Sequence, residues 1–175
     1  MLPSFNIENH SQQYFMEVSV KGNERVIQVL NDVLMAELTA TNIYFIHYRM
    51  QENWGYEKLA HHSREESMDE MKHADLMIER ILYLEGVPDM AKYDTILVGD
   101  SCEEQLKNQY TIEKKHVERL QNHIALCAEL KDFGSKEILD DILEETEKQC
   151  DWLETQFQRI KDVGIQNYLA ENMHK

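Results

Sequence analysis

The spacing of glycine is the feature that most limits how this chain folds. The 175 residues include only six glycines, at positions 22, 55, 86, 99, 134 and 164. Glycine is disfavoured inside helices and favoured at their ends. The spacing therefore predicts long helices within 23–54, 56–85, 100–133 and 135–163, and a short one after 165. Each long helix would extend about 45 Å.

The segment 87–99 interrupts this rhythm, because it contains Pro88 and Gly99 and carries no helical apolar stripe. Short links favour antiparallel neighbours, whereas a long link carries the chain the length of a bundle. We therefore expect an all-α, four-helix bundle with one long crossover and a short fifth C-terminal helix. Ser101 and Glu104 have the spacing of a capping box at the start of the third helix.

The net charge of −15 argues against a nucleic-acid partner, which requires a basic surface, and suits a protein that attracts cations. A merely solvated acidic surface is the alternative. No apolar run is long enough to span a membrane. Residues 1–20 lack the pattern of a secretory signal, so we interpret them as an N-terminal arm before a domain at 21–175. Cys102, Cys127 and Cys150 are widely spaced, as expected of reduced thiols in a cytoplasmic protein.

A bundle helix buries residues spaced alternately three and four apart. The predicted inward stripes are Val26, Leu30, Val33, Glu37, Tyr44 and Tyr48; Leu59, Glu66, Glu70, His73, Met77 and Leu84; Leu106, Tyr110, Glu113, Val117, Leu120, Ile124 and Cys127; and Leu139, Ile142, Thr146, Gln149, Leu153 and Ile160. Three of these stripes carry acidic side chains.

A buried carboxylate is costly unless it is paired or bound to metal. Glu70 and His73 form a Glu-x-x-His pair, a ligand arrangement of di-iron carboxylate bundles. Glu37 and Glu113 add carboxylates from two other helices. Carboxylate and imidazole suit iron, while the absence of thiolates argues against structural zinc. The alternative is a buried ion-pair network, but the stripes contain no Lys or Arg apart from Arg80.

The fourth helix departs from a symmetric di-iron site. Thr146 and Gln149 stand where a second Glu-x-x-His would complete it, while Glu144, Glu145, Glu147 and Cys150 are rotated off the stripe. His116 follows Glu113 by three residues, about 60° away around the helix. That angle leaves it within reach of a metal, but we expect a solvated surface position.

Several segments of the chain resemble the bacterioferritins, from about Val20 to the C-terminus. They are NERVIQVLNDVLMAELTATNIYF (23–45), NWG (53–55), DEMKHAD (69–75), IERILYLEG (78–86), DWLET (151–155) and GIQNYL (164–169). The resemblance implies a ferritin-like fold and a hollow shell of roughly two dozen subunits. It also implies oxidation of Fe(II) at a di-iron centre, storage of a ferric mineral, and b-type haem held between two subunits by one Met from each.

Residue by residue, the resemblance implies that Glu37, Glu70 and His73 bind the first iron and that Glu70 also bridges to the second. Glu113 matches a ligand of the second iron, and Met71 matches the haem ligand. Met71 lies about 100° from Glu70 around the helix. With Met68, Leu38 and Phe45 it would form an apolar patch suited to a subunit interface. The alternative for Met71 is a thioether packed against aromatic rings.

The departures from the family pattern are equally specific. Thr146 replaces the bridging Glu of the fourth helix, and Gln149 replaces its His. Arg64 and Glu65 replace an aromatic beside the haem and a His of the inner surface. The retained set resembles the minimal centre of haem-free ferritins, which also carry a Tyr at the place of Tyr44. Gln149 is a candidate holder of a metal-bound water.

Two functions follow as expectations. The first is an iron-storage subunit that oxidises Fe(II), with the activity full or weakened. The alternative is a haem-bearing, ferroxidase-deficient subunit that co-assembles with a competent relative. An electron-donor protein is the expected partner for iron release. The acidic surface argues against a DNA-protecting mini-ferritin, and the absence of a Cys-x-x-Cys pair argues against a rubrerythrin-like peroxidase.

Overall fold

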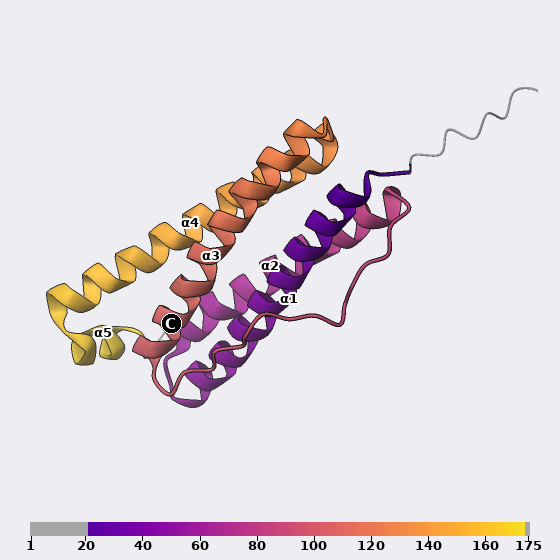
Figure 1. Ribbon diagram of the computed structural model, residues 1–175. Helices are drawn as coiled ribbons and strands as arrows, with labels where there is room; N and C mark the ends of the chain where they lie inside the picture. The colour runs from indigo at the N-terminus through magenta and orange to yellow at the C-terminus, as the bar shows by residue number, and fades with distance from the viewer. Residues whose placement is uncertain (1–20, 174–175) are drawn as a thin grey trace, which may run out of the picture.

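The computed structural model describes residues 21–173, which form five helices with no strand among them. α1 spans Glu24–Asn53, α2 Glu57–Tyr83, α3 Cys102–Glu129, α4 Phe133–Val163 and α5 Ile165–Glu171. α1 packs along α2, α3 packs along α4, and the two pairs form one bundle (Figure 1). The predicted four-helix bundle with a short fifth helix is confirmed.

The predicted arm, residues 1–20, lies outside the described residues, so the domain boundary at residue 21 stays a prediction. Within the described range, none of the helices combines the length and apolarity that a membrane crossing requires.

A long crossover, residues 84–101, carries the chain from one end of the bundle to the other and makes α2 and α3 parallel, as predicted (Figure 1). Side chains of α1 hold it in place. Asn31 Oδ1 accepts a hydrogen bond from the Asp89 amide at 2.7 Å, and Thr39 Oγ1 accepts one from the Asp94 amide at 2.9 Å. The crossover is therefore anchored along α1 beside the middle of the bundle.

Glycine marks most of the helix ends, but Gly134 does not. Gly55 and Gly164 adopt positive φ angles next to helix ends. Gly134 lies inside the first turn of α4, and Lys131 takes the left-handed conformation instead, with φ 58°. The boundary predicted at Gly134 was therefore wrong. Gly134 instead leaves room for Arg80, because an added Cβ would lie 2.8 Å from the Arg80 guanidinium and would force it to shift.

The predicted cap of α3 is present in a shifted form. Ser101 Oγ accepts a hydrogen bond from the Glu104 amide at 3.2 Å. The Glu104 carboxylate accepts the return bond from the Asp100 amide at 2.9 Å, one residue earlier than a capping box would place it. Two amides at the start of the helix are thereby satisfied.

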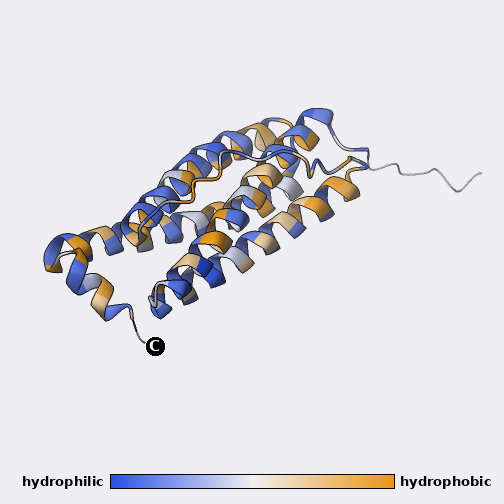
Figure 2. Ribbon diagram, turned by 90° about the horizontal axis from the view of Figure 1, so that it is seen from below, coloured by the Kyte–Doolittle hydropathy of each residue, from blue (hydrophilic) through white to orange (hydrophobic). Residues whose placement is uncertain are grey.

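Two apolar clusters occupy the two halves of the bundle. The larger contains Val26, Val29, Leu30, Val33, Leu34, Leu38, Ala74, Met77, Ile81, Leu84, Leu120, Cys127, Leu139 and Ile142. The smaller contains Leu59, Cys102, Leu106, Leu153 and Tyr168. Hydrophobic and hydrophilic turns alternate along each long helix (Figure 2). Each fully buried Leu contributes about 1.5–3 kcal/mol, which helps to offset the cost of burying polar groups between the clusters.

One part of this buried polar section is a chain of neutral side chains. His47 Nδ1 accepts a hydrogen bond from Gln109 Nε2 at 3.0 Å. Gln109 also reaches Ser63 Oγ at 3.3 Å, and Ser63 donates to Gln51 Oε1 at 2.9 Å. On its other side His47 Nε2 lies 3.0 Å from the Leu97 carbonyl, so a neutral ring satisfies both neighbours.

We predict that acid destabilises the protein through His47. Burial lowers the pKa of this histidine from 6.5 to about 4, although the hydrogen bond to Leu97 opposes the shift. Below pH 6.5 the unfolded chain binds a proton that the folded chain refuses until about pH 4. The free energy of unfolding should therefore fall by about 3 kcal/mol across this range. Urea unfolding midpoints at several pH values measure the loss. His47→Gln should show a shallower decline, and equal declines would contradict the assignment.

Candidate metal centre

Glu37 of α1 and Glu70 and His73 of α2 converge in the middle of the bundle. Each offers a ligand atom, and these atoms lie within 4.8 Å of one another. His73 Nδ1 lies 3.2 Å from Glu70 Oε2 and 3.7 Å from Glu37 Oε2. All three residues are buried. The structure thus brings together three of the predicted iron ligands, because residues three apart on α2 point the same way toward the inward stripe of α1.

Glu113 of α3 is also buried and is held by a chain of hydrogen bonds. Tyr44 Oη donates to Glu113 Oε1 at 2.6 Å. Gln149 Nε2 of α4 donates to Tyr44 Oη at 3.0 Å. Tyr44 therefore orients the Glu113 carboxylate. Gln149 therefore contacts the tyrosine, and its assignment as a metal ligand stays a prediction.

The position expected for His116 was wrong. Its ring is 6 % exposed and buried in the bundle, and Nε2 lies 2.8 Å from Glu37 Oε1. An offset of about 60° from Glu113 still lies within a buried stripe more than about 100° wide. The Glu-x-x-His spacing on α3 was the signal that could have found it.

α4 contributes to the centre from its rim. Thr146 is buried, but its hydroxyl donates back to the Ile142 carbonyl at 2.8 Å and contacts no carboxylate of the centre. Glu145, which the stripe excluded, instead reaches His73 Nε2 with its Oε2 at 2.8 Å. Its side chain is 60 % exposed, so a solvated carboxylate covers one side of the imidazole.

Arg80 does not neutralise the acidic side chains of the centre. Its guanidinium binds the Asp132 carboxylate at 2.6 Å and Ser135 Oγ at 2.9 Å, at one end of the bundle. In the described part of the chain, the ion pairs of Glu37 and Glu70 are formed with histidines alone. The ion-pair alternative therefore rests on imidazolium and on no lysine or arginine.

Burial drives the protonation of the centre. It raises the pKa of Glu70 well above its usual value, and Glu37 and Glu113 raise it further. Burial likewise raises the pKa of Glu113 to about 7, against the hydrogen bond from Tyr44. For Glu37, burial opposes ionisation, but the charge of His116, the hydrogen bond with His116 and the polar contacts with His73 and Glu70 together outweigh it and hold the pKa below its usual range. The metal-free centre therefore holds protons that a cation would displace.

His73 shares in this charge pattern. Burial lowers its pKa, but hydrogen bonds and charge from Glu37 and Glu70 raise it to about 11. The ring is therefore cationic at neutral pH while the centre is without metal. A metal that binds its nitrogen must take the place of a proton, so binding should release protons to solvent.

A cavity of about 290 Å³ opens onto the centre between α2 and α4. Glu70, His73 and Thr146 face it, and Glu66 and Asp69 line its acidic wall. Burial and neighbouring carboxylates raise the pKa of Glu66 to about 8. A cation that enters this opening would therefore displace a proton from Glu66 at neutral pH.

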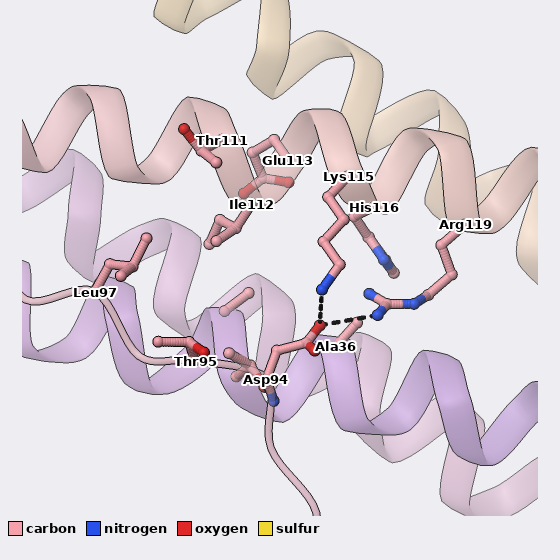
Figure 3. Close-up of a pocket in the computed structure, with 12 residues that line it drawn as sticks. Ala36, Asp94, Thr95, Leu97, Thr111, Ile112, Glu113, Lys115, His116 and Arg119 are labelled. Carbon is pink, nitrogen blue, oxygen red and sulfur yellow. Dashed lines mark hydrogen bonds and ion pairs between the residues drawn. The ribbon is translucent and has the colours of Figure 1, made fainter.

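A second cavity, of about 210 Å³, opens onto the opposite side of the centre between α1, α3 and the crossover. Glu113 and His116 descend into it from α3 (Figure 3). Lys115 and Arg119 at its edge bind the Asp94 carboxylate of the crossover at 2.9 and 2.8 Å. Cavities therefore adjoin the centre on two sides, and ion pairs of Lys115 and Arg119 with Asp94 lie at the edge of the second one.

Met71 lies outside the centre, on the surface of α2. Its side chain is 46 % exposed, and Met68 and Phe45 are 56 % and 53 % exposed. Leu38 was also expected in this patch, but it is 5 % exposed and belongs to the larger apolar cluster. Of the four residues expected in the patch, Met71, Met68 and Phe45 are exposed and Leu38 is not.

The three cysteines are free and buried. Burial raises the pKa of Cys102 to about 12 and those of Cys127 and Cys150 to about 11. Their thiols are therefore protonated at neutral pH, as expected of reduced, unreactive cysteines.

Carboxylates and an imidazole that project from several helices into a four-helix bundle with one long crossover define a ferritin-like protein. Residues 27–163 match the family model of the ferritin-like domain. The chain is 38 % identical over 152 residues to the bacterioferritin of Mycolicibacterium paratuberculosis (strain ATCC BAA-968 / K-10), which covers 87 % of this chain and 96 % of that protein.

Two further relatives give the same result. The bacterial ferritin of Synechocystis sp. (strain ATCC 27184 / PCC 6803 / Kazusa) is 40 % identical over 155 residues, 88 % of this chain and 99 % of that protein. The bacterioferritin of Rhodobacter capsulatus is 39 % identical over 153 residues, 87 % of this chain and 95 % of that protein. The chain belongs to the bacterioferritin family.

Proposed function

We propose that this chain is an iron-storage subunit that binds Fe(II) inside its bundle and oxidises it to Fe(III). The observation that carries the proposal is the convergence of Glu37, Glu70 and His73 without a lysine or arginine partner. Buried carboxylates that lack such partners favour a bound cation. Membership of the bacterioferritin family supports iron as that cation.

In this proposal Fe(II) enters through the acidic cavity beside Glu66 and Asp69. Glu37, Glu70 and His73 bind the first ion, and Glu113 binds the second, oriented by Tyr44. Two Fe(II) ions give two electrons to dioxygen, which takes up two protons to form hydrogen peroxide. We further propose that about two dozen copies form a hollow cytoplasmic shell that keeps the Fe(III) as mineral.

The direct test is aerobic addition of Fe(II) to the purified protein. We expect ferric absorbance to rise faster than in buffer, and iron to sediment with the protein in a high-mass assembly. The proposal is refuted if Fe(II) is oxidised no faster with the wild-type protein than in buffer and the iron does not sediment with the protein. Size-exclusion chromatography with light scattering measures the assembly separately from the chemistry.

Haem binding at the exposed patch is a second proposed activity, and the exposed Met71 favours it. A thioether at a two-fold interface would meet its copy from a second subunit, and the pair would hold b-type haem from both sides. An electron-donor protein could then reduce stored iron through the haem. If the centre fails to oxidise Fe(II), the chain would instead be a haem-bearing subunit that co-assembles with a competent relative.

We predict that Met71→Leu abolishes bis-thioether haem ligation, because leucine keeps the apolar volume but lacks the sulfur atom. Haem titration followed by visible absorbance and magnetic circular dichroism measures the ligation. Met68→Leu is the matched control, since Met68 is also exposed on the same helix, at 56 % against 46 % for Met71. An unchanged haem spectrum in Met71→Leu would refute the assignment.

A further inference from the structure

We propose that His116 and Glu113 of α3 form the second metal position and that Glu37, not Glu70, bridges the two positions. This inference rests on the proposed function, because it names the ligands of the same centre. It also names the residues that take over from the ligands that α4 lacks. The second metal would lie toward α1 and α3, on the side of the centre opposite to Thr146 and Gln149.

The first argument is the arrangement around Glu37. Its two carboxylate oxygens face different imidazoles. Oε1 lies 2.8 Å from His116 Nε2, and Oε2 lies 3.7 Å from His73 Nδ1. A carboxylate that presents each oxygen to a separate nitrogen donor has the geometry of a bridge between two ions.

The second argument is distance. Two ligand atoms that each bind a metal at about 2.0–2.2 Å lie about 3 Å apart when the angle between them is a right angle. The 2.8 Å separation of His116 Nε2 and Glu37 Oε1 is close to that value. A metal can therefore replace the shared proton with a small shift of either side chain.

The third argument is unsatisfied polarity. His116 is 6 % exposed and Glu37 is fully buried. His116 Nδ1 and Glu37 Oε2 are both buried without a hydrogen-bond partner. Buried polar atoms are normally bonded. Glu37 Oε2 faces His73 at 3.7 Å, beyond hydrogen-bond distance, so this oxygen is free to bind the first ion, whereas His116 Nδ1 is the ring nitrogen that does not face Glu37. No comparable contact with the carboxylates is made by Thr146, whose hydroxyl is bonded to its own helix.

The fourth argument is space and a further donor. Glu113 lies three residues before His116 on α3, so the two side chains are about 60° apart around the helix. Both line the cavity between α1, α3 and the crossover (Figure 3). That cavity can supply the water molecules that complete the coordination of an ion. Tyr44 fixes the other side of the Glu113 carboxylate at 2.6 Å.

Anaerobic binding of Co(II) to the purified, metal-free protein tests the inference. Equilibrium dialysis gives the stoichiometry, and visible absorbance reports the ligands. We expect two ions per wild-type chain and one per His116→Leu chain. His123→Leu is the control, because His123 is also on α3 but binds Asp32 away from the centre, at 2.7 Å. It should retain two ions.

The outcomes separate this inference from the proposed function. A wild-type protein that binds no Co(II) overturns both. Equal stoichiometry in the wild type and in His116→Leu overturns the inference alone, whether that stoichiometry is one or two. If the variant does not fold, anomalous scattering at the cobalt edge from wild-type crystals decides. A peak between Glu113 and His116 supports the inference, and a peak between Glu70 and α4 overturns it.

Discussion

Replacing Glu70 with alanine is expected to lower the rate of Fe(II) oxidation at least about a hundredfold. Loss of a residue that merely supports a metal ligand already costs 10–100-fold in activity or affinity, and the loss of a ligand should cost about that much or more. Glu70 lies 3.2 Å from His73 and shares the buried cluster with Glu37, so its loss removes a carboxylate from the centre itself. Stopped-flow absorbance under air measures the initial rate.

Glu79→Ala is the matched control for this experiment. Glu79 is an exposed carboxylate on the same helix, outside the residues that line the acidic cavity. This variant removes the same side chain from an exposed position and should leave the rate unchanged. Equal rates in the Glu70→Ala variant and the wild type would refute an oxidation site in the bundle and favour the haem-bearing subunit.

The Glu70→Ala variant should also change stability in the opposite direction to activity. Burial and the neighbouring Glu37 raise the pKa of Glu70 well above its ordinary value. An acid whose pKa is raised by folding destabilises the folded state as pH rises from the ordinary value toward the folded one. Removing Glu70 should therefore make the free energy of unfolding of the metal-free protein fall less steeply as the pH rises above about 5. Activity and metal-free stability are opposed at this position because the cluster is built for a cation.

The sequence predicted the helices well because glycine and helix length are local properties. Gly55 and Gly164 end helices by adopting positive φ angles that other residues avoid. Gly134 follows a different rule. It makes room for the guanidinium of Arg80, which is distant in sequence, and Lys131 accepts the left-handed turn instead. Spacing alone cannot separate a glycine needed for its backbone from one needed for its missing side chain.

The predicted ligands also divide into those that the local sequence pattern reveals and those that depend on tertiary packing. Glu37, Glu70, His73 and Glu113 interrupt apolar stripes, so their burial was predictable from periodicity alone. His116 was missed because α3 packs against both α1 and α4, and its buried arc is wider than a single stripe. Leu38 and Phe45 share one face of α1, yet only Phe45 is exposed. What covers a helix face at each level along its axis is a tertiary property, which periodicity does not contain.

Rebuilding the missing half of α4 should restore a second metal to the protein that lacks His116. In the His116→Leu background, Thr146→Glu together with Gln149→His is expected to raise Co(II) binding from one ion per chain to two. Thr146 and Gln149 are 5 % and 6 % exposed and lie on the inward stripe of α4. Glutamate and histidine at these positions would restore the Glu-x-x-His spacing on α4 that matches the pair on α2.

The charge at position 146 is the decisive element of that design, because a carboxylate binds and bridges cations whereas an amide of the same size does so weakly. The matched control therefore carries Thr146→Gln with the same changes at 149 and 116, and it should bind one ion. The rebuilt variant adds a carboxylate beside Glu70 and Glu113, whose pKa values burial already raises. Without metal, the rebuilt variant should unfold at a lower temperature than its control. With metal, it should unfold at a higher temperature than its control, because binding stabilises the folded state. If the rebuilt variant still binds a single ion, the side of the bundle near α4 cannot hold a metal in this chain. Ligands on the α3 side would then have replaced those that α4 lost, and restoring the family's residues on α4 would no longer restore a metal position there.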